Sequence, residues 1–221
     1  MRGIIFYCTK DVFKELAMKK GKVFVISGPS GVGKGTICKE LLEKLDIDLS
    51  VSMTTREPRA GEVHGESYFF VTHEEFENQI AAGGLMEYAR IYRNYYGTPK
   101  TRVIEKLEQG RDVLLEIEMQ GALQAKAAYP EAVLIFVLPP SLTELRKRLT
   151  ERGTETPENI ELRLSTTLKE IECIKGYDYY IVNDNLDRAV DAAACIIRAE
   201  HAKVSGSAEY IVNKYKEELV L

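Results

Sequence analysis

The residues with the clearest chemical potential form a glycine-rich segment that contains one lysine. It reads Gly28-Pro29-Ser30-Gly31-Val32-Gly33-Lys34-Gly35-Thr36. The segment follows the apolar, strand-like run Lys22–Ser27 and leads into the helix-like pattern Ile37–Leu42. A glycine loop between a strand and a helix directs backbone N–H groups and the helix dipole at an anion, and a lysine adds a point charge. The segment therefore predicts a cradle for phosphate groups.

The hydroxyl of this loop stands one position later than in the strict pattern G-x-x-x-x-G-K-[ST]. Gly35 follows Lys34, and Thr36 comes only after it. Because of this departure, no direct protein ligand for a metal ion is assured. Thr36 and Glu116 are the candidates, each through a water molecule.

Two groups of arginines could neutralise further phosphate charge. Arg56 and Arg59 lie three residues apart beside a turn, and Arg148 and Arg152 lie four apart, on one face of an expected helix. Arg163 stands on the helical stretch that follows. Guanidinium groups match phosphate oxygens in pairs, and converging arginines are typical of phosphoryl transfer. Taken singly, each also fits a solvated surface arginine.

Acidic side chains follow an apolar strand pattern at Val113–Ile117. Glu116 and Glu118 lie two residues apart, which predicts that they share one face of the sheet. Ligands of open parallel sheets bind beyond the carboxyl ends of the strands. The pair is thus a candidate for orienting substrate or metal-bound water, and an ordinary polar strand end is the alternative.

Three other positions have both a structural and a functional interpretation. Tyr68 could add a hydroxyl to the phosphate site of Arg56, or simply pack. Thr98, just before Pro99, predicts a helix N-cap. Glu87 fits either a site acid or an exposed acid after a helix.

Length, charge and cysteine content exclude several classes of protein. The chain has 221 residues, which fits one domain with inserts. Its net charge of −4 argues against a general binder of nucleic acid or of membrane surfaces. The four cysteines are widely spaced, as expected of reduced thiols rather than a zinc site. No apolar run approaches the roughly 18 residues of a membrane span. These features favour a cytoplasmic protein.

Strand-like apolar runs recur along the chain, and helical stretches separate most of them. The runs are Val23–Ile26, Leu49–Met53, Val113–Ile117, Ala132–Leu138 and Tyr179–Val182. This pattern predicts an α/β fold with a mainly parallel sheet and helices on both faces.

Two segments interrupt the pattern. Residues 54–100, termed the insert, are expected to hold a polar turn, a short strand near Tyr68–Val71 and one helix with a capping box at Thr72. Residues 143–172, termed the lid, are expected to form two arginine-bearing helices. Residues 1–20 are expected to be an extension outside the domain, either disordered or the product of an over-long reading frame that starts before Met18.

Together these stretches resemble the guanylate kinases, which phosphorylate GMP with ATP. The resemblance extends from Gly21 to about Ala202. Its motifs are G-P-S-G-V-G-K-G-T, V-S-M-T-T-R-E-P-R-A-G-E-V-H-G, N-Y-Y-G-T-P, E-I-E-M-Q-G-A, P-P-S, R-G-T-E-T and I-V-N-D-N. It implies a phosphate-loop nucleoside monophosphate kinase fold over residues 21–221, with a GMP-binding insert and a helical lid.

The resemblance also implies a role for individual residues. The ATP site would comprise Gly28, Pro29, Ser30, Gly31, Val32, Gly33, Lys34, Gly35 and Thr36, with Asn183 near the adenine. The GMP phosphate site would comprise Arg56, Arg59, Tyr68 and Tyr96, and the guanine site Ser52, Glu87, Thr98 and Glu118. The catalytic set would comprise Lys34, Arg56, Arg148, Arg152 and Arg163, with Mg²⁺ bound together with ATP.

Two departures from the family pattern bear on these roles. Many relatives have aspartate where Glu116 and Glu118 stand, and serine where Gly35 stands. The longer carboxylates leave open whether they contact ligands directly or through water.

Two alternatives remain beside a guanylate kinase. Another nucleoside monophosphate kinase would share the loop and the lid arginines but lack the guanine set. A non-catalytic, guanylate-kinase-like binding module would typically have lost residues of the phosphate loop, which is intact here. Use of dGMP as a second acceptor, and a monomeric or homo-oligomeric state, also stay open.

Overall fold

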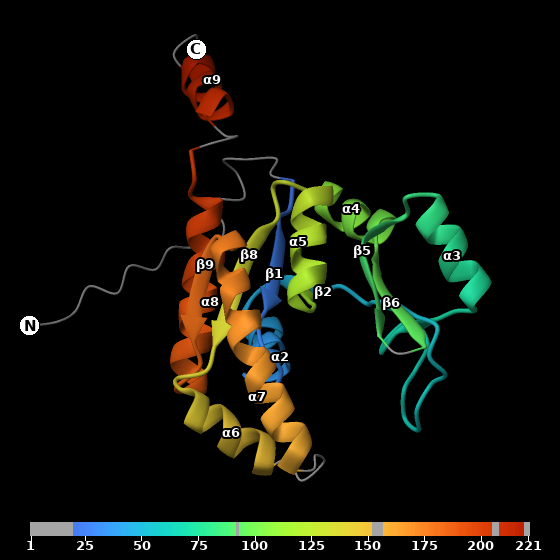
Figure 1. Cartoon of the computed structure of the whole chain (residues 1–221). Coiled ribbons are helices and arrows are strands. Elements are labelled where there is room, and N and C mark those ends of the chain that lie inside the picture. The colour runs from blue at the N-terminus through green and yellow to red at the C-terminus, as the bar shows by residue number, and fades with distance from the viewer. Residues whose placement is uncertain (1–19, 92, 152–156, 205–207, 219–221) are drawn as a thin grey trace, which may run out of the picture.

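The computed structural model describes residues 20–91, 93–151, 157–204 and 208–218 (Figure 1). Its centre is a five-stranded sheet in the order β2-β7-β1-β8-β9, in which all paired strands are parallel. The strands are β1 Val23–Ser27, β2 Ile47–Leu49, β7 Asp112–Glu116, β8 Val133–Leu138 and β9 Tyr179–Val182. The predicted parallel sheet is confirmed.

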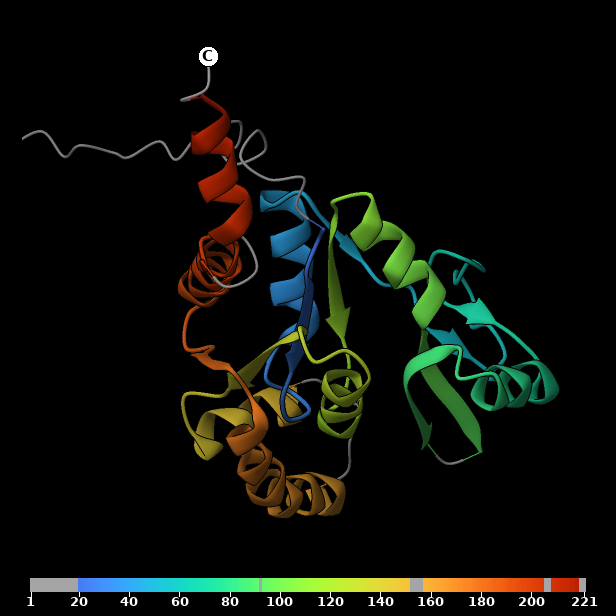
Figure 2. The same cartoon turned by 90° about the horizontal axis from the view of Figure 1, so that it is seen from above.

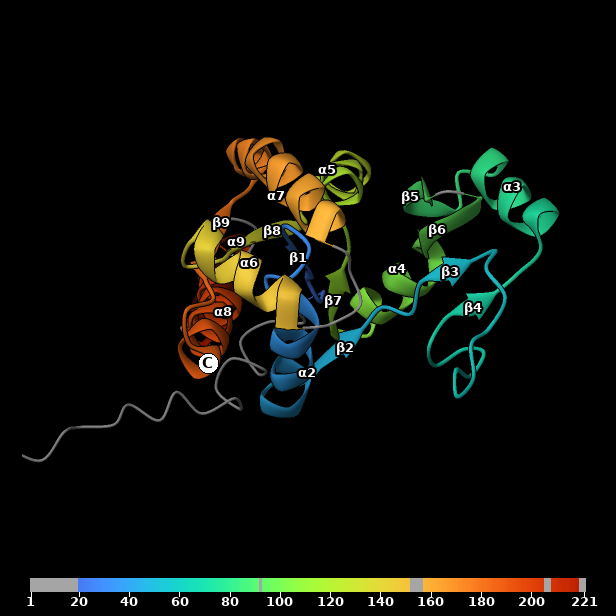
Figure 3. The ribbon, with the colours of Figure 1, turned by 60° about the horizontal axis from the view of Figure 1, so that its bottom comes forward.

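Helices cover both faces of this sheet. They are α2 Lys34–Lys44 and α8 Leu186–His201 on one face, and α4 Lys100–Glu108 and α5 Met119–Ala128 on the other. Along β1, Phe24 and Ile26 pack in the cluster of α2 and α8, whereas Val23 and Val25 pack in the cluster of α4 and α5. Figure 3 shows α2 and α5 on opposite sides of β1. Since successive side chains point to opposite faces, burial on both sides explains the unbroken apolar run.

The insert contains a second sheet, in the order β4-β3-β6-β5. Its elements are β3 Met53–Thr54, β4 Phe69–Phe70, α3 His73–Ala81, β5 Leu85–Ile91 and β6 Asn94–Pro99. The capping box of α3 is confirmed, because the Thr72 side chain accepts from the Glu75 N–H and the Glu75 carboxylate accepts from the Thr72 N–H. This sheet lies to one side of the core (Figures 1 and 2).

One expectation for this region is wrong, and one feature was missed. The run Leu49–Met53 is not one strand, because Leu49 ends β2 in the core sheet and Met53 begins β3 in the second sheet. The antiparallel hairpin β5–β6 was not expected. A register shift between Leu85 and Glu87 interrupts the alternation along β5, so this strand lacks a simple period of two.

The lid residues form two helices beyond the carboxyl end of β8, α6 Leu142–Glu151 and α7 Pro157–Glu172. An ion pair between Arg146 and Glu161 joins them. Pro157 opens α7 as expected. A 3₁₀ turn, Cys173–Gly176, then leads to β9, and a final helix, α9 Ala208–Glu218, follows α8.

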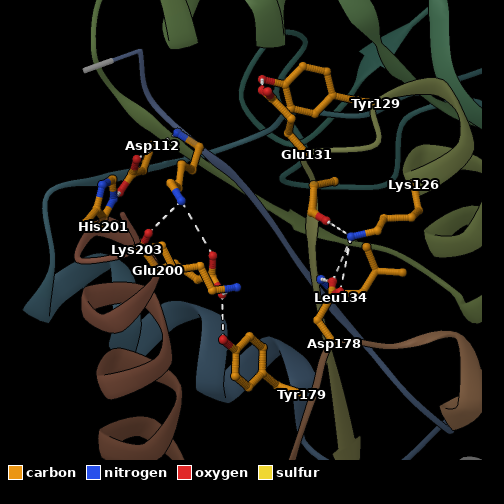
Figure 4. Close-up of polar contacts among 12 residues, drawn as sticks. Asp112, Lys126, Tyr129, Glu131, Leu134, Asp178, Tyr179, Glu200, His201 and Lys203 are labelled. Atoms are coloured by element: carbon orange, nitrogen blue, oxygen red, sulfur yellow. Dashed lines mark hydrogen bonds and ion pairs between the residues drawn. The ribbon is translucent and has the colours of Figure 1, made fainter. Parts of the chain in front are cut away.

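Polar anchors hold α8 to the amino-terminal side of the sheet (Figure 4). Glu200 is only 3% exposed; it accepts from the Tyr179 hydroxyl at 2.6 Å and pairs with Lys203 and Lys22. Burial opposes its ionisation, but these partners outweigh burial and hold the pKa of Glu200 below its ordinary value. The anchors thus lie at the end of the sheet opposite the glycine loop.

Within the ranges that the structure describes, no helix has the length and apolar character required to cross a membrane.

Candidate active site

The glycine-rich segment turns sharply between β1 and α2. Gly28 and Gly33 have φ angles of 147° and 92°, which side-chain-bearing residues rarely adopt. A Cβ on Gly28 would also lie 2.4 Å from the Val137 carbonyl oxygen, so the loop runs tightly against β8. The loop lines a recess with the following residues: Ser30, Gly31, Gly33, Lys34, Gly35, Thr36 and Glu116. Six of the nine loop residues predicted to bind ATP phosphates therefore share one concave surface with an acid.

Lys34 lies over its own loop. Its Nζ donates to the carbonyl oxygens of Gly28, at 2.7 Å, and Pro29, at 3.1 Å. Burial lowers the pKa of Lys34, while Glu116, Glu118 and the other nearby acids act in the opposite direction. The Lys34 ammonium is thus placed where it would attract negatively charged phosphate groups bound at the loop.

Glu116 ends β7 and faces the loop, because a Cβ on Gly35 would lie 3.4 Å from its Oε1. Burial raises the pKa of Glu116, and Lys34 opposes that rise. Glu118 does not share the strand, because the chain leaves the sheet after Glu116 and Glu118 is the N-cap residue of α5. The prediction that both acids point from one strand is wrong, although both lie at its carboxyl end.

The metal-binding capacity of this recess is limited. No group of three or more His, Cys, Asp or Glu residues able to hold a metal ion occurs in the described parts of the chain. Thr36 and Glu116 nevertheless line the same recess as Lys34. This donor set fits a hard cation that takes most of its oxygen ligands from phosphates and water.

In the insert, Arg56 is held by a carboxylate that sequence reasoning missed. Glu62 accepts from both terminal nitrogens of Arg56, at 2.9 and 3.0 Å, and from the backbone N–H of Arg59 at 2.7 Å. The Arg56 guanidinium also lies 5.5 Å from the centroid of the Tyr68 ring. A bidentate pair of this kind orients the guanidinium plane. The signal for Glu62 was its place in the same turn, six residues after Arg56.

Of the other residues predicted to bind the GMP phosphate, the two tyrosines lie near Arg56. The rings of Tyr68 and Tyr96 meet edge to face with centroids 6.1 Å apart. Burial raises the pKa of Tyr68 above its ordinary value, and its neutral hydroxyl can donate a hydrogen bond. The Arg59 side chain is exposed beside this group. Ser52, which is predicted for the guanine site, is half-buried just before the insert, and its backbone carbonyl accepts from the Phe69 N–H at 2.8 Å.

Glu87 and Thr98 form a buried polar pair across the hairpin. Glu87 lies on β5 and is 6% exposed; Thr98 lies opposite on β6 and is fully buried. The Thr98 hydroxyl donates to Glu87 Oε1 at 2.6 Å. Burial raises the pKa of Glu87, the Thr98 hydrogen bond opposes this rise, and the charge of Glu118 adds to it. The expected N-cap role of Thr98 is wrong, because Pro99 occupies that position of α4.

Arg148 and Arg163, the two described lid arginines of the predicted catalytic set, bind different residues. Arg148 donates to the Glu144 carboxylate at 2.9 Å and to the Asn183 carbonyl at 3.0 Å. Arg163 donates to the Ser30 hydroxyl of the loop at 2.6 Å. Arg152 lies outside the described residues. Arginines from both lid helices therefore contact residues at or near the loop.

Asn183 supports the loop from the end of β9. Its buried amide donates to the Val32 carbonyl at 2.8 Å, and a Cβ on Gly33 would lie 2.5 Å from the same amide nitrogen. The structure therefore shows Asn183 as a brace of the phosphate loop. Its predicted place near the adenine stays a prediction.

Sequence reasoning also missed Glu170 on α7. Its charge, with those of Glu116 and Glu118, acts on Lys34. Burial raises the pKa of Glu170. A single acid within a helix gives no sequence signal that it lies near Lys34. Its position near Lys34 results from the packing of the lid against the loop.

Comparison with known proteins agrees with this arrangement. The guanylate kinase family model matches residues 20–200. The guanylate kinase of Clostridioides difficile (strain 630) is 56% identical over 203 residues, which cover 91% of this chain and 99% of that protein. The guanylate kinase of Caldanaerobacter subterraneus subsp. tengcongensis is 50% identical over 203 residues, with 91% and 98% covered.

A solved structure shares the fold. The crystal structure of guanylate kinase from Anaplasma phagocytophilum aligns with a TM-score of 0.67 and 36% sequence identity, covering 84% of this chain and 88% of that one. The family-model match over residues 20–200 includes the core sheet, the insert and the lid helices, and it confirms the family resemblance of the motifs. The chain belongs to the guanylate kinase family.

Proposed function

We propose that this chain transfers the terminal phosphoryl group of ATP to GMP, with the glycine loop as the ATP site and the insert as the GMP site. The family relationship supports the reaction. The observation that carries the acceptor's identity is the buried pair of Glu87 and Thr98. Guanine presents N1–H and N2–H as donors, which a carboxylate accepts, and O6 as an acceptor, to which a hydroxyl donates.

The guanine site is proposed to comprise Ser52, Glu87, Thr98 and Glu118. Adenine lacks the N1–H donor, so AMP would leave the buried carboxylate unpaired. Sites of this type reject analogues strongly, because an unpaired buried polar group is costly.

The phosphate of GMP is proposed to bind to Arg56, Arg59, Tyr68 and Tyr96. The Glu62 carboxylate already fixes the plane of the Arg56 guanidinium. A phosphate oxygen is ionised at neutral pH, so the acceptor needs no general base. The residues proposed here therefore bind and neutralise the phosphate and need not remove a proton from it.

The donor phosphates are proposed to bind to the loop residues 28–36, with Lys34, Arg148, Arg152 and Arg163 neutralising the charge of the transferred group. Catalysis would then rest on positioning and charge neutralisation. Mg²⁺ bound with ATP would supply further charge neutralisation, and Thr36 and Glu116 would hold its water ligands. Glu116 faces Gly35 of the loop, which supports this assignment.

The insert and the lid are proposed to close over both nucleotides before transfer. They carry opposite halves of the charged set, and water would compete with GMP as an acceptor. We place this reaction in the cytoplasm, where nucleotides are interconverted and the free thiols of the described cysteines persist. A monomer and a homo-oligomer are equally consistent with this site, since each of its residues comes from one chain.

A panel of acceptors tests the function. A coupled assay measures the rate of ADP formation from ATP and Mg²⁺. The rates are compared for five acceptors: GMP, dGMP, AMP, UMP and dTMP. The proposal expects rapid turnover with GMP. Equal turnover with AMP or UMP would indicate another monophosphate kinase, and binding of GMP without turnover would indicate a non-catalytic module.

A further inference from the structure

Gly121, in the first turns of α5, lies directly against the Glu87 carboxylate. A Cβ built on Gly121 would stand 2.6 Å from Glu87 Oε2 and 3.3 Å from its Cδ. Gly121 belongs to the core, whereas Glu87 belongs to the insert. This is therefore a close approach of helix backbone to the acid proposed to bind guanine.

The backbone conformation does not require glycine at this position. Gly121 lies inside a helix and is not among the glycines of positive φ. Within a helix, glycine is less stable than alanine. Helix stability thus favours alanine, and the reason for glycine lies in what the residue faces.

Contacts on either side of Glu87 fix its position relative to α5. The Tyr88 N–H donates to Gln124 Oε1 at 3.2 Å. Met86 is 2% exposed and packs in the same buried cluster as Ala122 of α5. Because residues 86 and 88 are both tied to α5, the side chain between them cannot avoid Gly121 by a shift of the strand.

An added methyl group would therefore displace the carboxylate rather than the backbone. Glu87 Oε2 would have to move by about 0.8 Å, from 2.6 Å to the 3.4 Å at which ordinary contact begins. The carboxylate is the end of a flexible side chain, so the fold tolerates the move. The same move disturbs the group that receives the Thr98 hydroxyl at 2.6 Å.

We propose that Gly121 is a positioning residue for substrate selectivity: its missing side chain lets the Glu87 carboxylate lie where it receives both N–H groups of guanine. This inference rests on the proposed function. Displacement of a positioned group by less than 1 Å can lower efficiency by about two orders of magnitude. The effect should therefore appear in the use of GMP and not in the stability of the fold.

The test compares the parent with Gly121→Ala, using GMP and inosine monophosphate, which lacks the N2 amino group. We expect kcat/KM for GMP to fall by about tenfold to a hundredfold. The preference for GMP over inosine monophosphate should narrow, the KM for ATP should stay within about twofold, and the melting temperature without nucleotide should be equal or higher.

Two further variants separate positioning from a general effect on α5. Ala127→Gly makes the reverse exchange on the exposed side of the same helix, and should lower the melting temperature without changing selectivity. On a Glu87→Ala background, which lacks the carboxylate, Gly121→Ala should have no further effect on selectivity.

The outcomes are distinguishable. A parent that does not phosphorylate GMP overturns the proposed function and this inference together. An active parent with an equally selective Gly121→Ala variant overturns the inference alone. The inference is also overturned if Gly121→Ala still lowers kcat/KM for GMP on the Glu87→Ala background. It is overturned as well if Gly121→Ala lowers kcat/KM equally for GMP and inosine monophosphate and also lowers the melting temperature.

Discussion

Glu87 is a carboxylate whose burial opposes its ionisation. It is 6% exposed, it accepts a hydrogen bond from the Thr98 hydroxyl at 2.6 Å, and Glu118 adds like charge nearby. Such an acid is a candidate for function, because perturbed ionisation concentrates at functional sites. Guanine would supply the donors that this carboxylate needs in order to be charged.

Replacement of Glu87 by glutamine should stabilise the nucleotide-free protein at neutral pH. The pKa of Glu87 is raised in the folded state, so its contribution to stability is full below the unfolded pKa and is lost as pH rises through the folded pKa. Glutamine keeps the shape and does not titrate. The melting temperature of Glu87→Gln should exceed that of the parent at pH 7, and the two should converge near pH 4.

Glu77→Gln, at an exposed position of α3, serves as the control for this comparison and should change the melting temperature little at any pH. A Glu87→Gln variant that is less stable than the parent at pH 7 would show that ionised Glu87 stabilises the empty fold.

Lys34 should act on transfer rather than on binding of the acceptor. Its ammonium lies at the loop, whereas the proposed GMP site lies in the insert. Lys34→Met should lower kcat by about a hundredfold to a thousandfold, while the dissociation constant of GMP stays close to that of the parent. Single-turnover kinetics and calorimetric titration with GMP measure the two quantities.

Lys39→Met, at an exposed position of the same helix, should change neither quantity. Near-normal turnover of Lys34→Met would remove the loop lysine from the mechanism.

At the scale of elements, the end of β9 connects the lid to the phosphate loop. The amide of Asn183 donates to Val32 of the loop, and its carbonyl accepts from Arg148 of α6. The two partners of Asn183 thus lie in different segments, the phosphate loop and helix α6. Each of these segments contains residues proposed to bind ATP phosphates. Because Asn183 supports the loop, we expect it to contribute to ATP affinity.

Asn183→Ala should raise the KM for ATP by about tenfold. The substitution leaves the buried Val32 carbonyl without its donor, a loss of about 1–3 kcal/mol, part of which appears in loop geometry. The dissociation constant of GMP should not change. Initial rates at varied ATP, together with GMP titration, provide the measurement.

Asn185→Ala is a matched control, because Asn185 caps α8 by accepting from the Arg188 N–H at 3.1 Å. Loss of this cap should lower stability by about 1 kcal/mol and leave the KM for ATP unchanged. An equal rise of that KM in both variants would indicate a general loss of stability, and no rise in Asn183→Ala would exclude the brace.

Sequence reasoning succeeded for elements with one strong local signal. The strands β1 and β8 are buried apolar runs, β9 is an apolar run at the edge of the sheet, and the capping box at Thr72 starts α3 as expected. It failed where a local signal had a different partner in space. Thr98 resembles an N-cap, but its hydroxyl donates to Glu87 across the hairpin.

Contacts between distant parts of the chain were beyond a single sequence. Asn183 and Val32 are 151 positions apart, and Gly121 meets Glu87 only because α5 packs on β5. The motif that contains Gly121 was evident, but what its missing side chain faces depends on the fold.

At the scale of the whole molecule, the arginines of the insert and the arginines of the lid lie on separate projections from the core. Figures 1 and 2 show the insert on one side and the lid helices beyond the carboxyl ends of the core strands. Arg163 of α7 already contacts Ser30 of the loop. Joining the two substrates therefore chiefly requires the insert to approach the loop and the lid.

Binding of both nucleotides should make the molecule more compact. Small-angle scattering with GMP and a non-hydrolysable ATP analogue should give a smaller radius of gyration than scattering without nucleotide. Each nucleotide alone is the control and should give a smaller change. An unchanged radius with both nucleotides would contradict closure.

The central claim is that Glu87 selects the acceptor for a transfer carried out at the glycine loop. Its most direct test is kcat/KM for GMP and for AMP, measured for the parent and for Glu87→Gln at varied ATP. The parent should strongly prefer GMP. In the variant an amide donor faces the N–H groups of guanine, so GMP efficiency should fall by about tenfold to a few hundredfold, the preference over AMP should narrow, and the KM for ATP should stay nearly constant. A parent that uses AMP as readily as GMP, or a variant as efficient and selective as the parent, would contradict the claim.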